Sequence, residues 1–279
     1  MKKERKATPF EYMGCVFLLG ISKKFDRDLE TVKSILDKPE LTPADRVRLL
    51  MIYNPSFHDT GKIAGSTSFD SSAGNCIFCQ KMRQAAEQNA GHICNYCYDM
   101  DQENRWKEVM NRHSLNMLIM QTVEFTVDEL AILPATKINR INSSGDTPNK
   151  VYAKNMLNLA KANSELHFAY WAKNTRDVIA ACDEIGKPEN MTLVQSSYVI
   201  GRPAKLAKYF DFVFTVYATE DGIAEAIKRG AGECNGKKCM ECGWKCYLET
   251  WKKAGVKEVA EILRTKKGTL AKLAAAGVK

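Results

Sequence analysis

Eight of the ten cysteines in this chain fall into two compact sets whose spacing is that of metal ligands. A CxxC pair places two thiolates on one tight turn, so two such pairs can surround a single metal centre. Any fold for the chain must therefore bring the members of each set together. The sets are Cys76, Cys79, Cys94 and Cys97, and then Cys234, Cys239, Cys242 and Cys246.

The first set has the pattern CxxC-x14-CxxC, which overlaps that of a zinc ribbon. Residues 80–89, between its two pairs, are rich in helix formers, whereas a ribbon needs short strands there. This composition favours an iron–sulfur centre, with a four-thiolate zinc site as the alternative. His92 stands two residues before Cys94 and is a spare ligand, but four cysteines already suffice.

The second set, C-x4-C-x2-C-x3-C, resembles the compact cysteine runs of ferredoxins. No proline follows Cys246, so the match to the bacterial ferredoxin run is incomplete. Gly232, Gly236 and Gly243 supply the backbone freedom that wrapping a cluster requires. The pattern predicts a metal site, with iron–sulfur favoured and a four-thiolate zinc site as the alternative.

The two remaining cysteines, Cys15 and Cys182, stand alone at apolar positions with helical spacing, and we expect both to be buried structural residues. A chain of 279 residues can bury a full core without metals or disulfides. The metal sites are therefore expected to serve chemistry or local order. Clustered cysteines that bind metal are typical of the reducing cytoplasm, where we place the protein.

The N-terminus resembles a signal peptide, because lysines and an arginine precede the apolar stretch 12–21. Glu4 and Glu11 interrupt it and no small-residue cleavage site follows, so we predict a buried helix instead. No stretch approaches the roughly 20 apolar residues of a membrane span.

The chain has 41 lysines and arginines against 33 acidic residues, a formal net charge of +8. That excess favours anionic partners such as nucleic acid, with a generally basic exterior as the alternative. The basic C-terminal run, which includes Arg264, Lys266, Lys267, Lys272 and Lys279, is expected to be a solvated helix face.

The hydrophobic pattern divides the chain into three parts: a helical N-terminal extension over 1–55, an α/β region over 56–230 and a cysteine-rich segment with helices over 231–279. In the α/β region, strands alternate with helices of about ten residues, which predicts βαβ units and a parallel sheet. Five strands are expected, and a sixth near the second cysteine set, as in a partial barrel or an open doubly wound sheet. The predicted strands are 61–69, 137–142, 165–170, 191–197 and 212–217, and the helices are 106–121, 150–162, 175–185, 204–209 and 222–229.

Polar and small residues end three consecutive predicted strands. Ser143, Ser144, Gly145 and Asp146 follow one strand, and Lys173 and Ser197 stand at the ends of the next two. The carboxyl ends of parallel strands carry the binding site, so these residues predict a shared ligand pocket. The alternative is a plain turn in which Asp146 or Thr147 caps the next helix. Dinucleotide, P-loop, zinc-protease and serine-hydrolase motifs are absent from the sequence.

The order of these motifs resembles the phage-borne gene product 88 family over roughly residues 60–247. The resemblance depends on a strand, a cysteine set that closes in CY, the sequence INSSGD, the sequence FAYWAK and a final CxxxxCxxCxxxC.

That layout is similar in turn to radical S-adenosylmethionine enzymes, and implies a partial (β/α)6 barrel that holds a [4Fe–4S] cluster after its first strand. Cys94 and Cys97 resemble the last two ligands of the CxxxCxxC motif. The segment Ser143–Asp146 resembles the contact to the methionine amine, and the second cysteine set resembles an auxiliary cluster. The position four before Cys94 is Ala90, so the third ligand must be Cys76 or Cys79, and a radical mechanism needs only three.

Three functions follow from these expectations. The first is an enzyme that resembles radical S-adenosylmethionine enzymes, with one or two [4Fe–4S] clusters, S-adenosylmethionine and a small-molecule substrate in a pocket at Asp146, Lys173 and Ser197. The second is a non-catalytic nucleic-acid-binding module with two zinc sites. The third is an electron carrier with two clusters, which leaves the strand-end polar residues unexplained.

Overall fold

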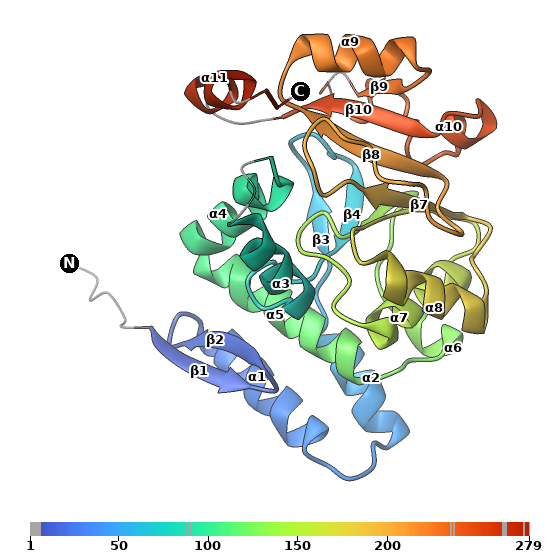
Figure 1. Cartoon of the computed structure of the whole chain (residues 1–279). Coiled ribbons are helices and arrows are strands. Elements are labelled where there is room, and N and C mark those ends of the chain that lie inside the picture. Colours follow the sequence, from blue (N-terminus) through green and yellow to red (C-terminus); the bar gives the residue numbers. More distant parts are fainter. Residues whose placement is uncertain are drawn as a thin grey trace.

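A large, mostly parallel β-sheet forms the centre of the computed structural model (Figure 1). The structure describes residues 7–87, 89, 91–234, 236, 238–263, 267–275 and 277–278. Within them the sheet has eight strands in the order β3-β4-β5-β6-β7-β8-β10-β9, and only β3 runs antiparallel to its neighbour. The predicted α/β class with a parallel sheet is confirmed. The strands are β3 (Ser56–His58), β4 (Ser66–Phe69), β5 (Ile138–Ile141), β6 (His167–Ala172), β7 (Met191–Ser196), β8 (Phe212–Tyr217), β9 (Gly232–Cys234) and β10 (Glu258–Ile262), beside a separate hairpin of β1 (Thr8–Tyr12) and β2 (Cys15–Leu19).

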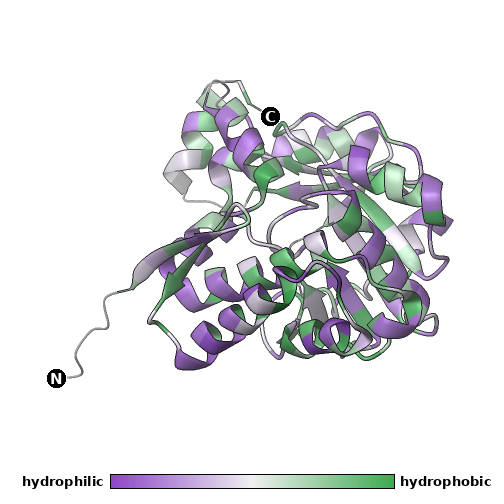
Figure 2. Cartoon of the chain, turned by 90° about the horizontal axis from the view of Figure 1, so that it is seen from below, coloured by the Kyte–Doolittle hydropathy of each residue, from purple (hydrophilic) through white to green (hydrophobic). Residues whose placement is uncertain are grey.

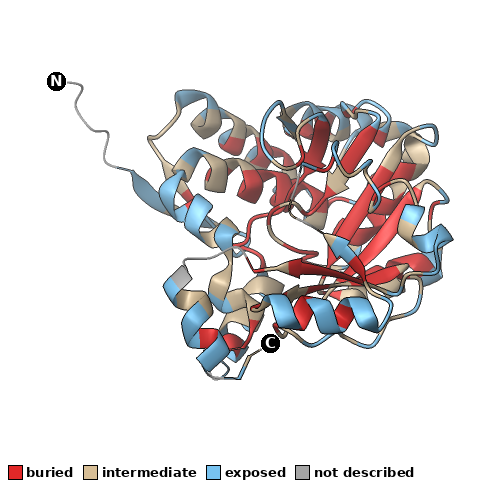
Figure 3. Cartoon of the chain, turned by 90° about the horizontal axis from the view of Figure 1, so that it is seen from above, coloured by how far each residue is buried: buried red, intermediate tan, exposed pale blue. Residues whose placement is uncertain are grey.

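The helices cover one face of this sheet, and the second cysteine segment covers the other. Along β6, Phe168 and Tyr170 belong to the main apolar core with helices α5, α7 and α8, whereas Ala169 and Trp171 pack with residues of the segment 239–251. The inner strands of the sheet, from β4 to β8, are mostly buried, and hydrophobic residues concentrate on the strands and on the helix faces toward them (Figures 2 and 3). The helices are α1 (Lys23–Leu36), α2 (Pro43–Ile52), α3 (Ile77–Ala86), α4 (Tyr98–Arg105), α5 (Lys107–Thr122), α6 (Val127–Leu130), α7 (Lys150–Ala162), α8 (Thr175–Ile185), α9 (Glu220–Lys228), α10 (Thr250–Lys253) and α11 (Lys267–Ala275), with the short 3₁₀ helix η1 (Ile93–Tyr96).

The N-terminal hairpin corrects the helix predicted for residues 12–21. Met13 and Gly14 both have positive φ, at 48° and 73°, which reverses the chain in a two-residue turn. After the turn, Cys15 and Phe17 are buried while Val16 is exposed, which is the period of a strand and not of a helix. Cys15 is buried as predicted, but it lies in β2.

The second correction concerns residues 204–209, which form no helix. The side chain of Gln195 donates to the carbonyl oxygen of Lys205 and accepts from the amide of Ala207, and Ser197 Oγ accepts from the amide of Ala204. These bonds hold the segment along the end of β7 and use backbone groups that a helix would need. The first strand of the α/β region is also shorter than predicted, because residues 61–65 form turns before β4.

The two ends of the large sheet are connected through the second cysteine segment. Lys62, which precedes β4, forms an ion pair with Glu261 of β10, and its carbonyl oxygen accepts a hydrogen bond from the amide of Cys239 at 2.7 Å. Five strands lie between β4 and β9, so this contact requires a curved sheet. In the part of the chain that the structure describes, the edge strands β3 and β9 are not hydrogen-bonded to each other, so this sheet is not a closed barrel.

The C-terminal helix α11 carries Lys272 on its exposed side, as predicted for a solvated helix face. Arg264, Lys266 and Lys279 of the same basic run lie outside the described residues. Among the helices of the described residues, none has the length and apolarity needed to span a membrane.

Candidate metal and ligand site

A cavity of about 1150 Å³ opens at the carboxyl ends of the parallel strands. Residues from both cysteine sets line it, although the sets are far apart in the sequence. All six residues predicted to bind a ligand line it as well, because their strands end at the same edge of the sheet. The lining includes Cys94, Cys97, Cys234, Cys239, Cys242 and Cys246, together with Ser143, Ser144, Gly145, Asp146, Lys173 and Ser197.

A second cavity, of about 40 Å³, is lined by three members of the first cysteine set. Cys79, Cys94 and Cys97 line it together with Asp146 and Lys173. Cys76 lines neither cavity, since its side chain is fully buried and its Sγ lies 3.9 Å from the carbonyl oxygen of Asp146. The structure therefore places three thiols of this set around one space and the fourth behind them.

The thiols are gathered, but they do not form a finished metal site. Among the described residues, no group of three or more His, Cys, Asp or Glu side chains is positioned to hold a metal ion. Burial raises the pKa of Cys97 to about 11 and also raises that of Cys94, so these two thiols are protonated near neutral pH. Metal binding would therefore release protons and draw the sulfur atoms together.

Lys173 supplies a positive charge beside these thiols. Burial lowers its pKa, but the carboxylate of Asp146 and the sulfur atoms of Cys94 and Cys79 outweigh that effect, and the net pKa is raised. A permanently charged ammonium favours thiolates and anionic groups in its surroundings.

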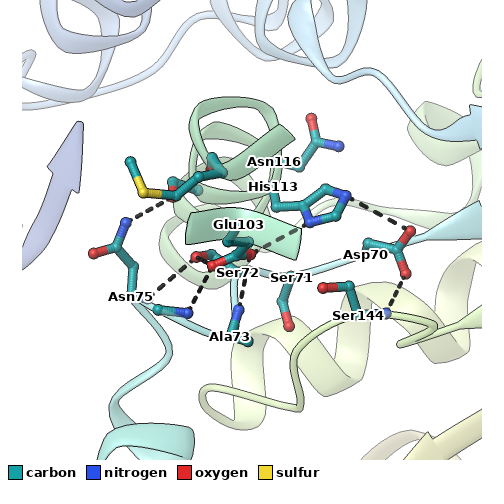
Figure 4. Close-up of polar contacts among 12 residues, drawn as sticks. Asp70, Ser71, Ser72, Ala73, Asn75, Glu103, His113, Asn116 and Ser144 are labelled. Carbon is teal, nitrogen blue, oxygen red and sulfur yellow. Dashed lines mark hydrogen bonds and ion pairs between the residues drawn. The ribbon is translucent and has the colours of Figure 1, made fainter. Parts of the chain in front are cut away.

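The loop that carries the first cysteines is held by a buried carboxylate from helix α4. Glu103 accepts hydrogen bonds from the amide of Ala73 at 3.1 Å, the amide of Gly74 at 2.8 Å and the hydroxyl of Ser72 at 3.0 Å (Figure 4). Only 2% of Glu103 is exposed. These bonds fix the turn that leads into Cys76 and α3.

A second buried carboxylate, that of Asp70, holds the loop that follows β5. It accepts from the amide and hydroxyl of Ser143, both at 2.7 Å, and from the amide of Ser144 at 2.9 Å. Burial acts to raise the pKa of Asp70, but the charge of His113 and the hydrogen bonds from Ser68, Ser143 and Ser144 outweigh it and lower the pKa.

The imidazole of His113 lies between the two carboxylates (Figure 4). Its Nδ1 is 3.4 Å from Glu103 Oε1, and its Nε2 is 4.0 Å from Asp70 Oδ2. Sequence reasoning missed all three residues and treated His113 as merely structural. The position of Asp70 directly after β4 was the one available signal.

The two loops touch directly at Gly145, whose φ is +74°. A Cβ atom there would stand 2.2 Å from Ser71 Oγ and 2.4 Å from the Ser71 carbonyl oxygen. Only glycine allows this contact. The loop that follows β5 (143–146) is therefore packed directly against the loop that follows β4 and leads to Cys76.

The polar groups of the predicted pocket are partly used within the protein. The carboxylate of Asp146 accepts from the amides of Thr147 at 2.7 Å, Lys173 at 2.9 Å and Asn174 at 3.3 Å. These contacts tie the ends of β5 and β6 together. The N-cap of α7 is Asn149, so the alternative in which Asp146 or Thr147 caps that helix is wrong.

The second cysteine set lies in a run of turns against aromatic rings. Trp171 of β6 packs on Tyr247 with ring centroids 5.4 Å apart, and Trp244 packs on Tyr247 at 5.1 Å. Gly243 has a φ of +69°, as expected for a segment that wraps around a centre, and Gly236 has a φ of +70°. Gly232 lies in β9 instead, with the Trp251 ring 3.0 Å from where a Cβ would stand.

Two thiols of the second set are also neutral at physiological pH. Burial raises the pKa of Cys239 to about 11 and that of Cys246 to about 12. Cys234 lies 3.4 Å from the ammonium of Lys62, which lowers its thiol pKa against a larger rise caused by burial. All four thiols face the same cavity as Cys94 and Cys97.

Two other residues considered in the sequence, His92 and Cys182, line neither cavity. His92 Nδ1 accepts a hydrogen bond from the amide of Cys94 at 3.2 Å and caps η1, and its ring lines neither cavity. Cys182 is buried in α8, as predicted.

Comparison with known proteins gave one match. The sequence model of the family described as Gene product 88 matches residues 54–266, a range that includes both cysteine sets and every strand of the large sheet. No curated protein and no solved structure matches the chain.

Proposed function

The chain belongs to the gene product 88 family, and on that premise we propose that it is an iron–sulfur enzyme similar to radical S-adenosylmethionine enzymes. The observation that carries the proposal is the set of three thiols, Cys79, Cys94 and Cys97, around one small cavity beside a much larger one. Three thiolates bind a [4Fe–4S] cluster and leave one iron open for a small ligand.

The strand order supports this assignment. Strands β4, β5, β6, β7, β8 and β10 are parallel and adjacent in chain order, which is the order of a partial (β/α)6 barrel. The first cysteine set follows the first of these strands, and the ligand loop 143–146 follows the second. Catalytic groups at the carboxyl ends of barrel strands are the rule for such folds.

The chemistry of the donors fits the group. Thiols are the ligands of [4Fe–4S] clusters, and six of the eight clustered thiols, those of Cys94, Cys97 and the second set, line the large cavity. A cluster with an open iron would supply an electron to a bound S-adenosylmethionine. The four cysteines of the second set would hold an auxiliary cluster.

The residues of the chain then have distinct tasks. Cys79, Cys94 and Cys97 hold the first cluster, and Cys76 packs behind them against the carbonyl oxygen of Asp146. Lys173 presents a cation to the bound ligand. Glu103 fixes the turn before Cys76, and Asp70 fixes the loop that carries Ser143 and Ser144.

Metal analysis of anaerobically purified protein tests the proposal. We expect a brown protein with several irons per chain that cleaves S-adenosylmethionine on reduction. A colourless protein with stoichiometric zinc would refute the assignment and favour the nucleic-acid-binding alternative, which also predicts salt-dependent binding. A brown protein that transfers electrons without cleaving S-adenosylmethionine would instead indicate an electron carrier.

A further inference from the structure

Unpartnered polar atoms concentrate in the large cavity. Seven buried side-chain nitrogen or oxygen atoms in the described residues have no hydrogen-bond partner, and five of them belong to residues that line this cavity. A buried polar atom without a partner costs about 1–3 kcal/mol, so such atoms mark a place where a ligand supplies the missing bonds. The five atoms are Asp99 Oδ1, Arg112 Nε, His113 Nδ1, Arg140 Nε and Tyr247 Oη.

Most of these atoms are hydrogen-bond donors. The Nε–H groups of Arg112 and Arg140 can only donate, and the hydroxyl of Tyr247 can donate. His113 Nδ1 has a neighbour, since it lies 3.4 Å from a Glu103 oxygen. The cavity therefore needs a ligand with acceptor oxygens.

Arg140 lies beside an aromatic ring of the cavity lining. It is on β5, and its guanidinium is 4.2 Å from the centroid of the Trp171 ring. A guanidinium stays charged at every physiological pH and binds carboxylate or phosphate through two nitrogens. No ion pair is recorded for Arg140 or Arg112 among the described residues.

The nearby carboxylate of Asp70 does not satisfy these cations. Its oxygens accept from Ser68 Oγ, from the amide and hydroxyl of Ser143 and from the amide of Ser144. Burial raises the pKa of Asp99 to about 7, so near neutral pH its carboxyl, which also lines the cavity, can either accept from the ligand or donate to it.

We propose that Arg140, Arg112 and Tyr247 bind the carboxylate or phosphate group of the substrate, between the two cysteine sets. The proposal names the substrate class for the enzyme described above and so rests on that proposed function. Within the proposal, this subsite lies apart from Lys173 and the loop 143–146, where S-adenosylmethionine would lie.

Calorimetric titration of the anaerobic holoprotein with inorganic phosphate and with glutarate tests the subsite. We expect one of the two to bind, with a Kd at least about tenfold higher in Arg140→Gln and in Arg112→Gln, a loss of about 1.4 kcal/mol. Tyr247→Phe, which removes only a hydroxyl, should raise the Kd a few-fold, and Arg140→Lys should give an intermediate value. Preference for phosphate or for glutarate identifies the group.

The matched control is Arg176→Gln, because Arg176 pairs with Asp177 on the surface with 86% of its side chain exposed. It should leave the Kd unchanged. Binding that is absent in the parent protein, or equal in the parent and both arginine variants, would overturn the proposal. Displacement of the anion by S-adenosylmethionine would overturn it too, since Arg140 would then hold the cofactor's own carboxylate.

The titration does not depend on iron or on turnover, so it separates this inference from the proposed function. Arg140-dependent anion binding by a zinc protein supports the subsite while the radical enzyme fails. Cleavage of S-adenosylmethionine without anion binding supports the enzyme while the subsite fails.

Discussion

The two cysteine sets face one cavity, but the chain holds them in different ways. The first set lies between the end of β4 and the start of α4, and the buried carboxylate of Glu103 binds the backbone of the turn that leads into Cys76. The second lies in turns between β9 and α10, where aromatic packing, backbone hydrogen bonds and contacts with Lys62 hold it.

We infer from this difference that the fold orders part of the first site before a metal binds, whereas metal binding itself orders more of the second site. Buried charged hydrogen bonds to Glu103 fix the turn before Cys76 before any metal is bound. In the second set the amide of Cys239 bonds to the carbonyl oxygen of Lys62 within a run of turns, so we expect metal ligation to supply more of its order. The first set thus suits chemistry that demands fixed geometry, and the second suits an auxiliary role.

The strongest test is to remove single ligands of the first set. Cys79→Ser should lose about one cluster, on the order of four irons per chain, and reduce cleavage of S-adenosylmethionine to background. Cys76→Ser should keep both properties, because Cys76 lines neither cavity. Iron analysis and a product assay measure them.

Cys182→Ser, at a buried position in α8, controls for the loss of any buried thiol. If Cys76→Ser loses iron as Cys79→Ser does, all four cysteines ligate the cluster. The open iron, and with it the radical mechanism, would then be excluded.

Removal of the metals should change the local order of the two regions to clearly different extents. In the second set, the amide of Trp244 donates to the carbonyl oxygen of Cys239 at 2.9 Å within a run of turns. Chelation should speed hydrogen exchange at this amide by about 100-fold. The amide of Gly74, bonded to buried Glu103, should change by less than about tenfold.

Exchange followed by mass spectrometry on peptides from each region measures both rates. Equal acceleration in the two regions would show that the first site also depends on its metal for order. The inferred contrast between the two sites would then be wrong.

Gly145 and Gly243 have nearly equal φ values, so their alanine variants compare how tightly the two regions are packed. Gly145→Ala places a Cβ 2.2 Å from Ser71 Oγ and should destabilise the fold by about 3–5 kcal/mol through the clash and the positive φ. Gly243→Ala meets nothing within 4 Å and should cost only the strain of a positive φ, about 1–2 kcal/mol. Urea unfolding gives both free energies, and equal losses would contradict the closer packing of the first region.

The sequence predicts these two regions unequally, for physical reasons. Helices 150–162 and 175–185 and strand 212–217 have the predicted bounds, because local periodicity specifies them. The pocket residues from Ser143 to Ser197 gather as predicted, because parallel strands share one edge.

What sequence could not predict depends on contacts between distant residues. Glu103 binds a turn about thirty residues away, and nothing local in α4 signals that role. The predictions of a helix around Met13 and over 204–209 are wrong for a related reason. In both, turn geometry or side chains from another element outweigh a pattern that favours a helix.

The smallest effect concerns charge and pH. Asp70 in the first region and Glu249 in the second both have a lowered pKa. Burial acts to raise the pKa of Asp70, but the charge of His113 and several hydrogen bonds outweigh it. For Glu249 the main cause is the hydrogen bond from Lys252. A carboxyl whose pKa is lower in the folded state stabilises the fold above its unfolded pKa of about 4, and that stability is lost as the pH falls through the folded value. At pH 7, Asp70→Asn should cost about 2 kcal/mol, and Glu249→Gln about 0.5 kcal/mol, because its pairing is partly exposed to solvent.

The pH profile of these two variants distinguishes a buried network from a surface ion pair. The difference between the parent protein and Asp70→Asn should hold from pH 7 to pH 5 and shrink below about pH 4, where the carboxyl of Asp70 is protonated first in the unfolded chain and, at the lower folded pKa, then in the folded protein. Added salt should reduce the effect of Glu249→Gln and leave that of Asp70→Asn nearly unchanged, since buried charges are screened less. Urea unfolding at several pH values, with and without salt, measures both. A salt-sensitive loss in Asp70→Asn would mean that the loops of the first site are open to solvent and are not fixed by buried hydrogen bonds.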